Sequence, residues 1–103
     1  MNQIEQTLDS REVAEMVGKR HDHLIRDIKK YISEMSAPNF GEGNELKIEA
    51  VDFFRETTYK DAKGQERPCY DITKKGCEFI AHKLTGIKGT EFTARYINRF
   101  HDM

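Results

Sequence analysis

Apolar residues in the first third of the chain recur at intervals of three and four, which is the period of an amphipathic helix. The pattern predicts a short helix from about Ser10 to Gly18 and a longer helix over residues 21–35. The apolar stripe of the longer helix consists of Leu24, Ile25, Ile28, Tyr31, Ile32 and Met35. At about 100° per residue these side chains share one face, and the opposite face is basic.

Local signals mark both ends of the short helix. Asp9 is a typical N-cap residue, and Glu12 stands three positions later, where the acidic member of a capping box is found. Leu8 precedes the cap and is expected to pack against Val13 as a hydrophobic staple. Gly18 suits the other end of the helix because glycine adopts a positive φ without steric cost.

The middle of the chain predicts a β-hairpin. Two runs rich in aromatic and β-branched residues, 51–59 and 68–73, flank a polar stretch that contains Gly64. Pro68 cannot donate to a strand ladder, so we expect it at an edge position or at the start of the second strand. Residues 36–44, ahead of the hairpin, combine Pro, Gly, Ser and Asn and predict an irregular loop.

The last third of the chain predicts two further helices. Thr73 is expected to cap a third helix that closes at Gly86, and a fourth helix is expected to begin near Thr90. The apolar stripe of the fourth helix comprises Phe92, Tyr96, Ile97, Phe100 and Met103. We expect this stripe to belong to the core, with a dimer seam as the alternative.

Composition limits the classes of protein that the chain can represent. A length of 103 residues suits one domain with a modest core, so we expect residues 1–103 to form a single domain. Ten aromatic residues argue against intrinsic disorder, although 34% of the chain is charged. The sequence contains neither an apolar run of roughly 18 residues nor a signal-peptide pattern. We therefore expect a cytoplasmic protein without a membrane partner.

Charge is distributed unevenly along the chain, although the net charge is −1. Residues 18–31 hold five basic and two acidic side chains, and residues 59–76 hold five basic and three acidic ones. Residues 32–58, between these two segments, hold six acidic and two basic side chains. Positive charge is therefore concentrated on the second predicted helix and around the turn of the hairpin.

Two helices joined by a tight turn, the second one basic on its outer face, are the parts of a helix-turn-helix. The motif needs a small residue where its helices cross closely and a glycine in the turn. Counted from Ser10, Ala14 stands fifth and Gly18 stands ninth, so the sequence meets both requirements.

One part of the motif departs from its usual form. The apolar residues normally found fifteenth and eighteenth would be Leu24 and Asp27, and a charge cannot be buried there without a partner. A shift by one residue places Ile25 and Ile28 at these positions. We therefore predict a turn that is one residue longer than in the simplest repressors.

These elements predict an α+β fold, a winged helix-turn-helix-like domain with a β-hairpin wing and C-terminal helices. In such a domain the recognition helix approaches base edges in the major groove of double-stranded DNA, while neighbouring basic residues meet phosphates. The wing tip is expected on the DNA backbone or in an adjacent groove. The candidate DNA-binding residues are Lys19, Arg20, His23, Arg26, Lys29 and Lys30 in the turn and second helix, and Lys60, Lys63 and Arg67 in the hairpin.

Other interpretations of these residues stay open. A basic helix face is often only a solvated face. His21 projects toward the apolar side of the second helix. It is therefore at least as readily interpreted as a packed, hydrogen-bonded residue near the helix N-terminus as a base contact. Asp22 could accept from a cytosine amino group, or it could be favoured there only by the helix dipole.

Three blocks of the sequence resemble one family. In "SREVAEMVGKRHDHLIRDIKK", "FFRETTYKDAKGQERPCYDITKKG" and "LTGIKGTEFTARYINRF", in this order, the chain resembles the phage regulatory protein Rha family of temperate phages and prophages. The resemblance implies a DNA-binding regulator, in a bacterial host cell, of the choice between lysogeny and lytic growth. Related phage regulators carry a separate C-terminal domain, so the chain is either a short member or a truncated one.

The sequence also bears on two further function classes. Enzymatic activity is not expected, because the spacing of Cys69, Cys77, His82 and His101 matches no thiol–imidazole signature. The cysteines are expected to be reduced, with no metal and no cofactor. The main rival is an antirepressor or adaptor that binds a phage or host regulatory protein, which the acidic residues 32–58 and the near-zero net charge favour. A homodimer is expected if DNA is read as two half-sites.

Overall fold

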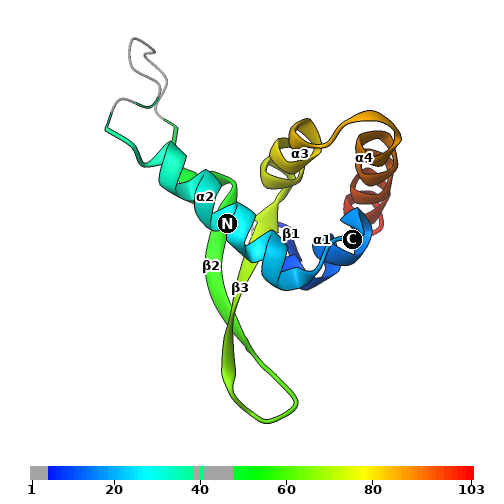
Figure 1. The fold of residues 1–103 in the computed structure, drawn as a ribbon. Coiled ribbons are helices and arrows are strands. Elements are labelled where there is room, and N and C mark those ends of the chain that lie inside the picture. Colours follow the sequence, from blue (N-terminus) through cyan, green and yellow to red (C-terminus); the bar gives the residue numbers. More distant parts are fainter. Residues whose placement is uncertain (1–4, 39, 41–47) are drawn as a thin grey trace, which may run out of the picture.

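The computed structural model describes residues 5–38, 40 and 48–103 of the chain. Within them the fold is α+β, with four α-helices and one three-stranded antiparallel sheet (Figure 1). Most of the loop predicted over residues 36–44 lies outside the described residues. The elements follow in the order β1 (Thr7–Asp9), α1 (Ser10–Val17), α2 (His21–Met35), the 3-10 helix η1 (Ala50–Asp52), β2 (Phe54–Lys60), β3 (Glu66–Thr73), α3 (Lys74–Lys83) and α4 (Gly86–His101).

The sheet has the strand order β1-β3-β2, and the hairpin β2–β3 extends far beyond β1. β1 pairs only with the last three residues of β3, so the rest of β3 pairs with β2 alone. In Figure 1 the turn of the hairpin projects away from the helices. The hairpin confirms the sequence prediction, whereas β1 was not predicted because three residues are too few to show a period.

Pro68 lies in the central strand but at a position that has only one neighbouring strand, since β1 ends opposite Asp71. The amide of Tyr70, two residues on, donates to the hydroxyl of Ser10 on the β1 side of the strand. Because backbone groups alternate along a strand, the nitrogen of Pro68 faces this same open side. Its missing N–H therefore costs no ladder hydrogen bond, as the predicted edge position requires.

α1 and α2 have the predicted bounds, and the cap of α1 differs in one detail. The Asp9 side chain accepts from the backbone amide of Arg11, and Gly18 ends the helix with a φ of 78°. Glu12 does not complete the capping box. Its carboxylate instead accepts a hydrogen bond of 2.7 Å from Nε of Arg99, which ties α1 to α4.

Two predicted boundaries in the last third are wrong. Thr73 caps α3 as expected, but α3 ends at Lys83 and α4 begins at Gly86, four residues before the predicted start. The first turn of α4 carries Ile87, which is 74% exposed, so no buried residue marks the turn before Phe92. The predicted core stripe of α4 is also only partly buried, since Ile97 and Met103 are exposed.

The start of the first hairpin strand also differs from the prediction. Residues 50–52 form η1 instead of strand, and β2 begins at Phe54. Val51 is 57% exposed, although its place in an apolar run had suggested a residue of a buried strand. The backbone oxygens of Asp52 and Phe53 accept from the hydroxyl and the amide of Thr73, and this closes the turn against the end of β3.

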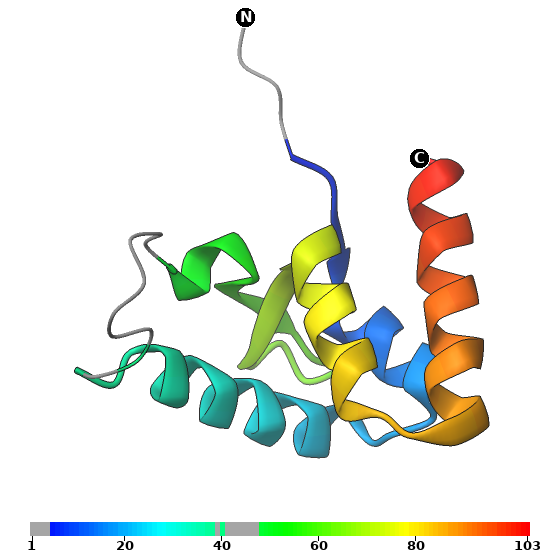
Figure 2. The same ribbon diagram turned by 90° about the horizontal axis from the view of Figure 1, so that it is seen from above.

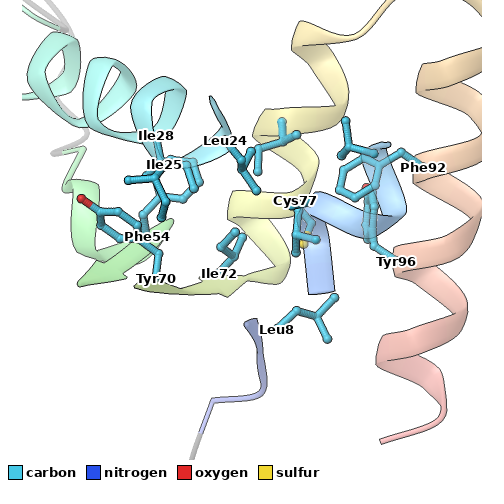
Figure 3. Packing of buried hydrophobic residues seen from close by; sticks show 14 of the residues in the cluster. Leu8, Leu24, Ile25, Ile28, Phe54, Tyr70, Ile72, Cys77, Phe92 and Tyr96 are labelled. Atoms are coloured by element: carbon cyan, nitrogen blue, oxygen red, sulfur yellow. The ribbon is translucent and has the colours of Figure 1, made fainter. Parts of the chain in front are cut away.

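A single buried cluster joins the sheet to all four α-helices (Figure 3). Phe54 of β2, Ile72 of β3 and Leu8 of β1 lie at its sheet side. Figure 2 shows α2 along one side of the sheet, and α3 between the sheet and α4. This core fixes α1, α2 and the base of the hairpin relative to one another.

Candidate nucleic-acid interface

The nine predicted DNA-binding residues lie in two groups. Six of them form what we call the α2 surface: Lys19, Arg20, His23, Arg26, Lys29 and Lys30. The other three form the hairpin tip: Lys60, Lys63 and Arg67. Figure 1 shows that α2 crosses the base of the hairpin, so the two groups belong to neighbouring elements.

The first turn of α2 packs directly against the hairpin. The ring of His21 meets the ring of Tyr59 in β2 edge-on, with centroids 5.8 Å apart. Beside this contact is a groove of about 310 Å³ between helix and hairpin, lined by His21, Asp22, Ile25, Tyr59, Arg67 and Pro68. Polar and apolar groups from both elements therefore face one cleft next to the α2 surface.

Three of the predicted residues on the α2 surface are in ion pairs within the protein. Lys19 Nζ lies 2.7 Å from Oδ2 of Asp27, and Nε of Arg26 lies 3.8 Å from the other oxygen of that carboxylate. Arg20 pairs with Asp22 at 3.1 Å, where both side chains are more than 60% exposed. The positive charge of this surface is therefore lower than the count of basic residues suggests.

The remaining members of the α2 surface have no ion-pair partner among the residues that the structure describes. Lys29 and Lys30 are exposed, and neither forms an ion pair with another described residue. His23 is half-buried in the first turn of the helix. The unpaired charge thus lies in the middle of α2, and the paired charge lies near its N-terminus.

Asp61 organises the hairpin tip. Its Oδ1 accepts from the backbone amides of Lys63 and Gln65, and its Oδ2 accepts from Nε of Arg67 at 3.0 Å. The hydrogen bond from Arg67 is the main reason why the pKa of this carboxyl is lowered. Gly64 completes the turn with a φ of 78°. Arg67 is thereby held in place, while Lys60 and Lys63 are exposed to solvent.

A buried polar cluster at the root of these elements was not predicted from the sequence. Ser10 is fully buried, and its Oγ lies 2.8 Å from Nε2 of His21, 3.3 Å from Sγ of Cys69 and 3.0 Å from the amide of Tyr70, which donates to it. His21 is therefore the packed, hydrogen-bonded residue that one of the two sequence interpretations described. Nothing in the pattern marked Ser10, since a serine beside an N-cap is usually exposed.

The pKa values of ionisable groups in and beside this cluster are shifted. Arg11 forms a two-pronged ion pair with Asp9 and, at 4.2 Å from the ring centroid, stacks over Tyr59. The hydrogen bond from Arg11 lowers the pKa of Asp9 to about 2. Burial lowers the pKa of His21, with the Asp9 carboxylate opposing this effect. The neutral form of His21 is thus favoured in the folded protein.

Both cysteines are buried free thiols. Burial raises the pKa of Cys69, and it raises the pKa of Cys77 to about 12. Such thiols are protonated at neutral pH and are poor nucleophiles. Among the residues that the structure describes, no three His, Cys, Asp or Glu side chains are grouped to hold a metal ion. None of the helices in that part of the chain has the length and apolar character needed to span a membrane.

Comparison with known proteins identifies one matching family. The family described as phage regulatory protein Rha matches residues 8–103. The SPbeta prophage-derived candidate antirepressor YoqD of Bacillus subtilis (strain 168) is 46% identical over 96 residues, which cover 93% of this chain and 35% of the relative. An uncharacterised protein of Haemophilus influenzae (strain Rd) is 34% identical over 95 residues, which cover 92% of this chain and 50% of the relative.

The chain therefore spans only about a third to a half of the length of these two relatives. No solved structure matches the chain significantly.

Proposed function

This chain belongs to the phage regulatory protein Rha family, and from that premise we propose that it binds double-stranded DNA to control phage gene expression. Such a protein would act in the cytoplasm of the bacterial host. The proposal assigns α1 and α2 as a helix-turn-helix, with α2 in the major groove, and the β2–β3 hairpin as the wing of a winged-helix domain.

The arrangement of the elements supports this assignment. A three-residue turn, residues 18–20, joins the two helices, and Ala14 is buried in the core that both helices share. Leu24, Ile25 and Ile28 are all buried, so their burial does not distinguish the usual spacing of the motif from the longer turn expected from the sequence. The hairpin follows α2 in the chain and projects beyond the core, which leaves its tip available to a ligand (Figure 1).

The observation that carries the proposal is the direct contact of α2 with the hairpin through His21 and Tyr59. This contact joins α2 to the hairpin, and the two elements line a common groove, which supports a binding surface made of both. A duplex that received α2 in its major groove would then meet the lysines of the tip along its backbone.

The ion pairs of the α2 surface are compatible with phosphate binding. Exposed pairs contribute only about 0–1 kcal/mol to stability because water and salt screen them. Arg20 and Arg26, which are both more than 70% exposed, can exchange their carboxylate partners for phosphates at little cost. Lys29 and Lys30 form no ion pair with another described residue, so they can bind phosphates without giving up a carboxylate partner.

Binding to a fluorescent random-sequence duplex at several salt concentrations tests the proposal. If four to six cations neutralise phosphates, log affinity falls with log salt by about 0.9 for each contact. Arg26→Ala is expected to weaken binding at an unchanged melting temperature. The proposal is contradicted if the chain fails to bind duplexes even at low salt. It is also contradicted if Arg26→Ala has the same affinity and the same melting temperature as the unmodified chain.

A second candidate function is an antirepressor or adaptor that binds a phage or host regulatory protein. The name of the relative YoqD favours it, as does the net charge of −1. Protein partners seldom impose a steep salt dependence, so the same titration separates the two functions. The mass of the free chain and of its DNA complex, by light scattering, decides whether two copies bind two half-sites as a homodimer.

A further inference from the structure

The buried hydroxyl of Ser10 connects the three elements that the proposed DNA-binding surface uses. Ser10 is the first residue of α1, His21 is the first residue of α2, and Tyr70 belongs to β3 at the base of the hairpin. The hydroxyl oxygen lies within 3.0 Å of both Nε2 of His21 and the amide nitrogen of Tyr70. One atom therefore links the starts of both helices to the hairpin.

The polar neighbours of Ser10 allow a consistent assignment of donors and acceptors that holds His21. The Tyr70 amide donates to the serine oxygen, and the Cys69 thiol donates to Oδ1 of Asp9. The serine proton is then available for Nε2 of His21, the nearer of its two remaining neighbours. In this arrangement Nε2 accepts from the serine hydroxyl, and the imidazole proton is on Nδ1.

The other side of the His21 imidazole is fixed by the hairpin. Tyr59 contacts the imidazole edge-on, and the Arg11 guanidinium, itself held by Asp9, lies over the Tyr59 ring. His21 is thus confined by a hydrogen bond from α1 and by a ring of β2. Neither contact is available to its neighbours Arg20 and Asp22, which are exposed and pair with each other.

We propose that His21 is a positioning residue, which sets the orientation of the first turn of α2 relative to the hairpin and so determines how well the protein discriminates its preferred DNA sequence. This inference rests on the proposed DNA-binding function. His21 acts through Ser10 and Tyr59 and does not itself need to touch a base. Orientation matters for sequence readout because hydrogen bonds to base edges tolerate little displacement, whereas phosphate attraction is tolerant.

The test compares two substitutions that remove different parts of His21. His21→Gln puts an amide near the place of Nε2 and keeps the hydrogen bond with Ser10, whereas His21→Phe keeps a ring against Tyr59 and loses that bond. The measured quantity is the ratio of affinities for a duplex selected from a random pool and for the unselected pool. His82→Phe in α3 is the matched control, since it replaces an exposed histidine outside the proposed surface.

We expect His21→Phe to lower this ratio about tenfold, comparable to one mismatched base pair, with little change in affinity for the unselected pool. His21→Gln should restore most of the ratio, and the control should keep all of it. A purely stabilising role would lower the melting temperature and leave the ratio of the folded protein unchanged. An unchanged ratio in His21→Phe therefore overturns the inference.

Two further measurements cover other outcomes. If His21→Phe does not fold, Tyr59→Leu removes the contact from the hairpin side and should lower the affinity ratio, while Tyr59→Phe should leave the ratio unchanged.

If the unmodified chain binds no DNA, the proposed function fails. Amide NMR spectra of His21→Phe then test the positioning role independently of DNA binding. Shifted signals along β2 and β3 support that role, and shifts confined to residues near position 21 refute it.

Discussion

Lys19 Nζ donates to Oδ2 of Asp27 over 2.7 Å, which joins the turn of the proposed helix-turn-helix to the second turn of α2. Asp27 stands where this motif usually carries an apolar residue, and its side chain is 22% exposed. The ion pair supplies the partner that a half-buried carboxylate needs. It also neutralises one cation of the α2 surface, and the nearby Arg26 is attracted to the same carboxylate.

Replacing Asp27 by Asn should therefore strengthen DNA binding. The substitution leaves the shape of the side chain nearly unchanged and removes a negative charge beside Lys19 and Arg26. We expect an affinity gain of about fivefold at low salt, which corresponds to about 1 kcal/mol for one screened charge at contact distance. Asp102→Asn, at the far end of α4, is the control for net charge. An equal gain in both variants would show that the position of Asp27 is irrelevant.

Periodicity predicted the bounds of α1 and α2 because their buried faces repeat without interruption. It could not place the start of α4, whose first turn carries the exposed Ile87, or find the short strand β1. The predicted basic residues do gather on two adjoining elements. Their ion pairs with Asp22, Asp27 and Asp61 could not be predicted, because a pair depends on side-chain orientation and not on spacing alone.

His21 is expected to make stability depend on pH. Burial lowers the pKa of His21 in the folded protein, so the unfolded chain takes up the proton more readily. The stabilisation is present above the unfolded pKa, near 6.5, and is lost as pH falls from there toward the lower folded value. Urea unfolding should thus give a smaller free energy of unfolding at pH 5.5 than at pH 7.5. This loss should shrink in His21→Gln and persist in His82→Gln.

Gly76 is required by packing at the start of α3. A Cβ atom there would clash with the backbone oxygen of Phe53 and would lie 2.8 Å from Cγ2 of Ile72. Gly76→Ala should therefore lower the free energy of unfolding by about 3 kcal/mol, since the backbone around the end of β3 must move. Gly89→Ala in α4 is the matched control, because the nearest atom is 3.4 Å away and alanine favours helix. Equal unfolding midpoints in urea would contradict the close approach at Gly76.

Lys63 offers the sharpest test of the hairpin tip, because its side chain is exposed and pairs with no other described residue. Lys63→Ala should reduce the slope of log affinity against log salt by about 0.9 if one phosphate contact is lost. Lys88→Ala in α4 removes the same charge from an exposed residue outside both groups of basic residues.

Because both variants have the same net charge, a difference between their slopes reports the position of the charge and not its sum. Melting temperatures should stay equal in the two variants, since neither lysine makes a buried contact. Equal slopes would remove the hairpin tip from the DNA-binding surface and leave α2 as its remaining candidate.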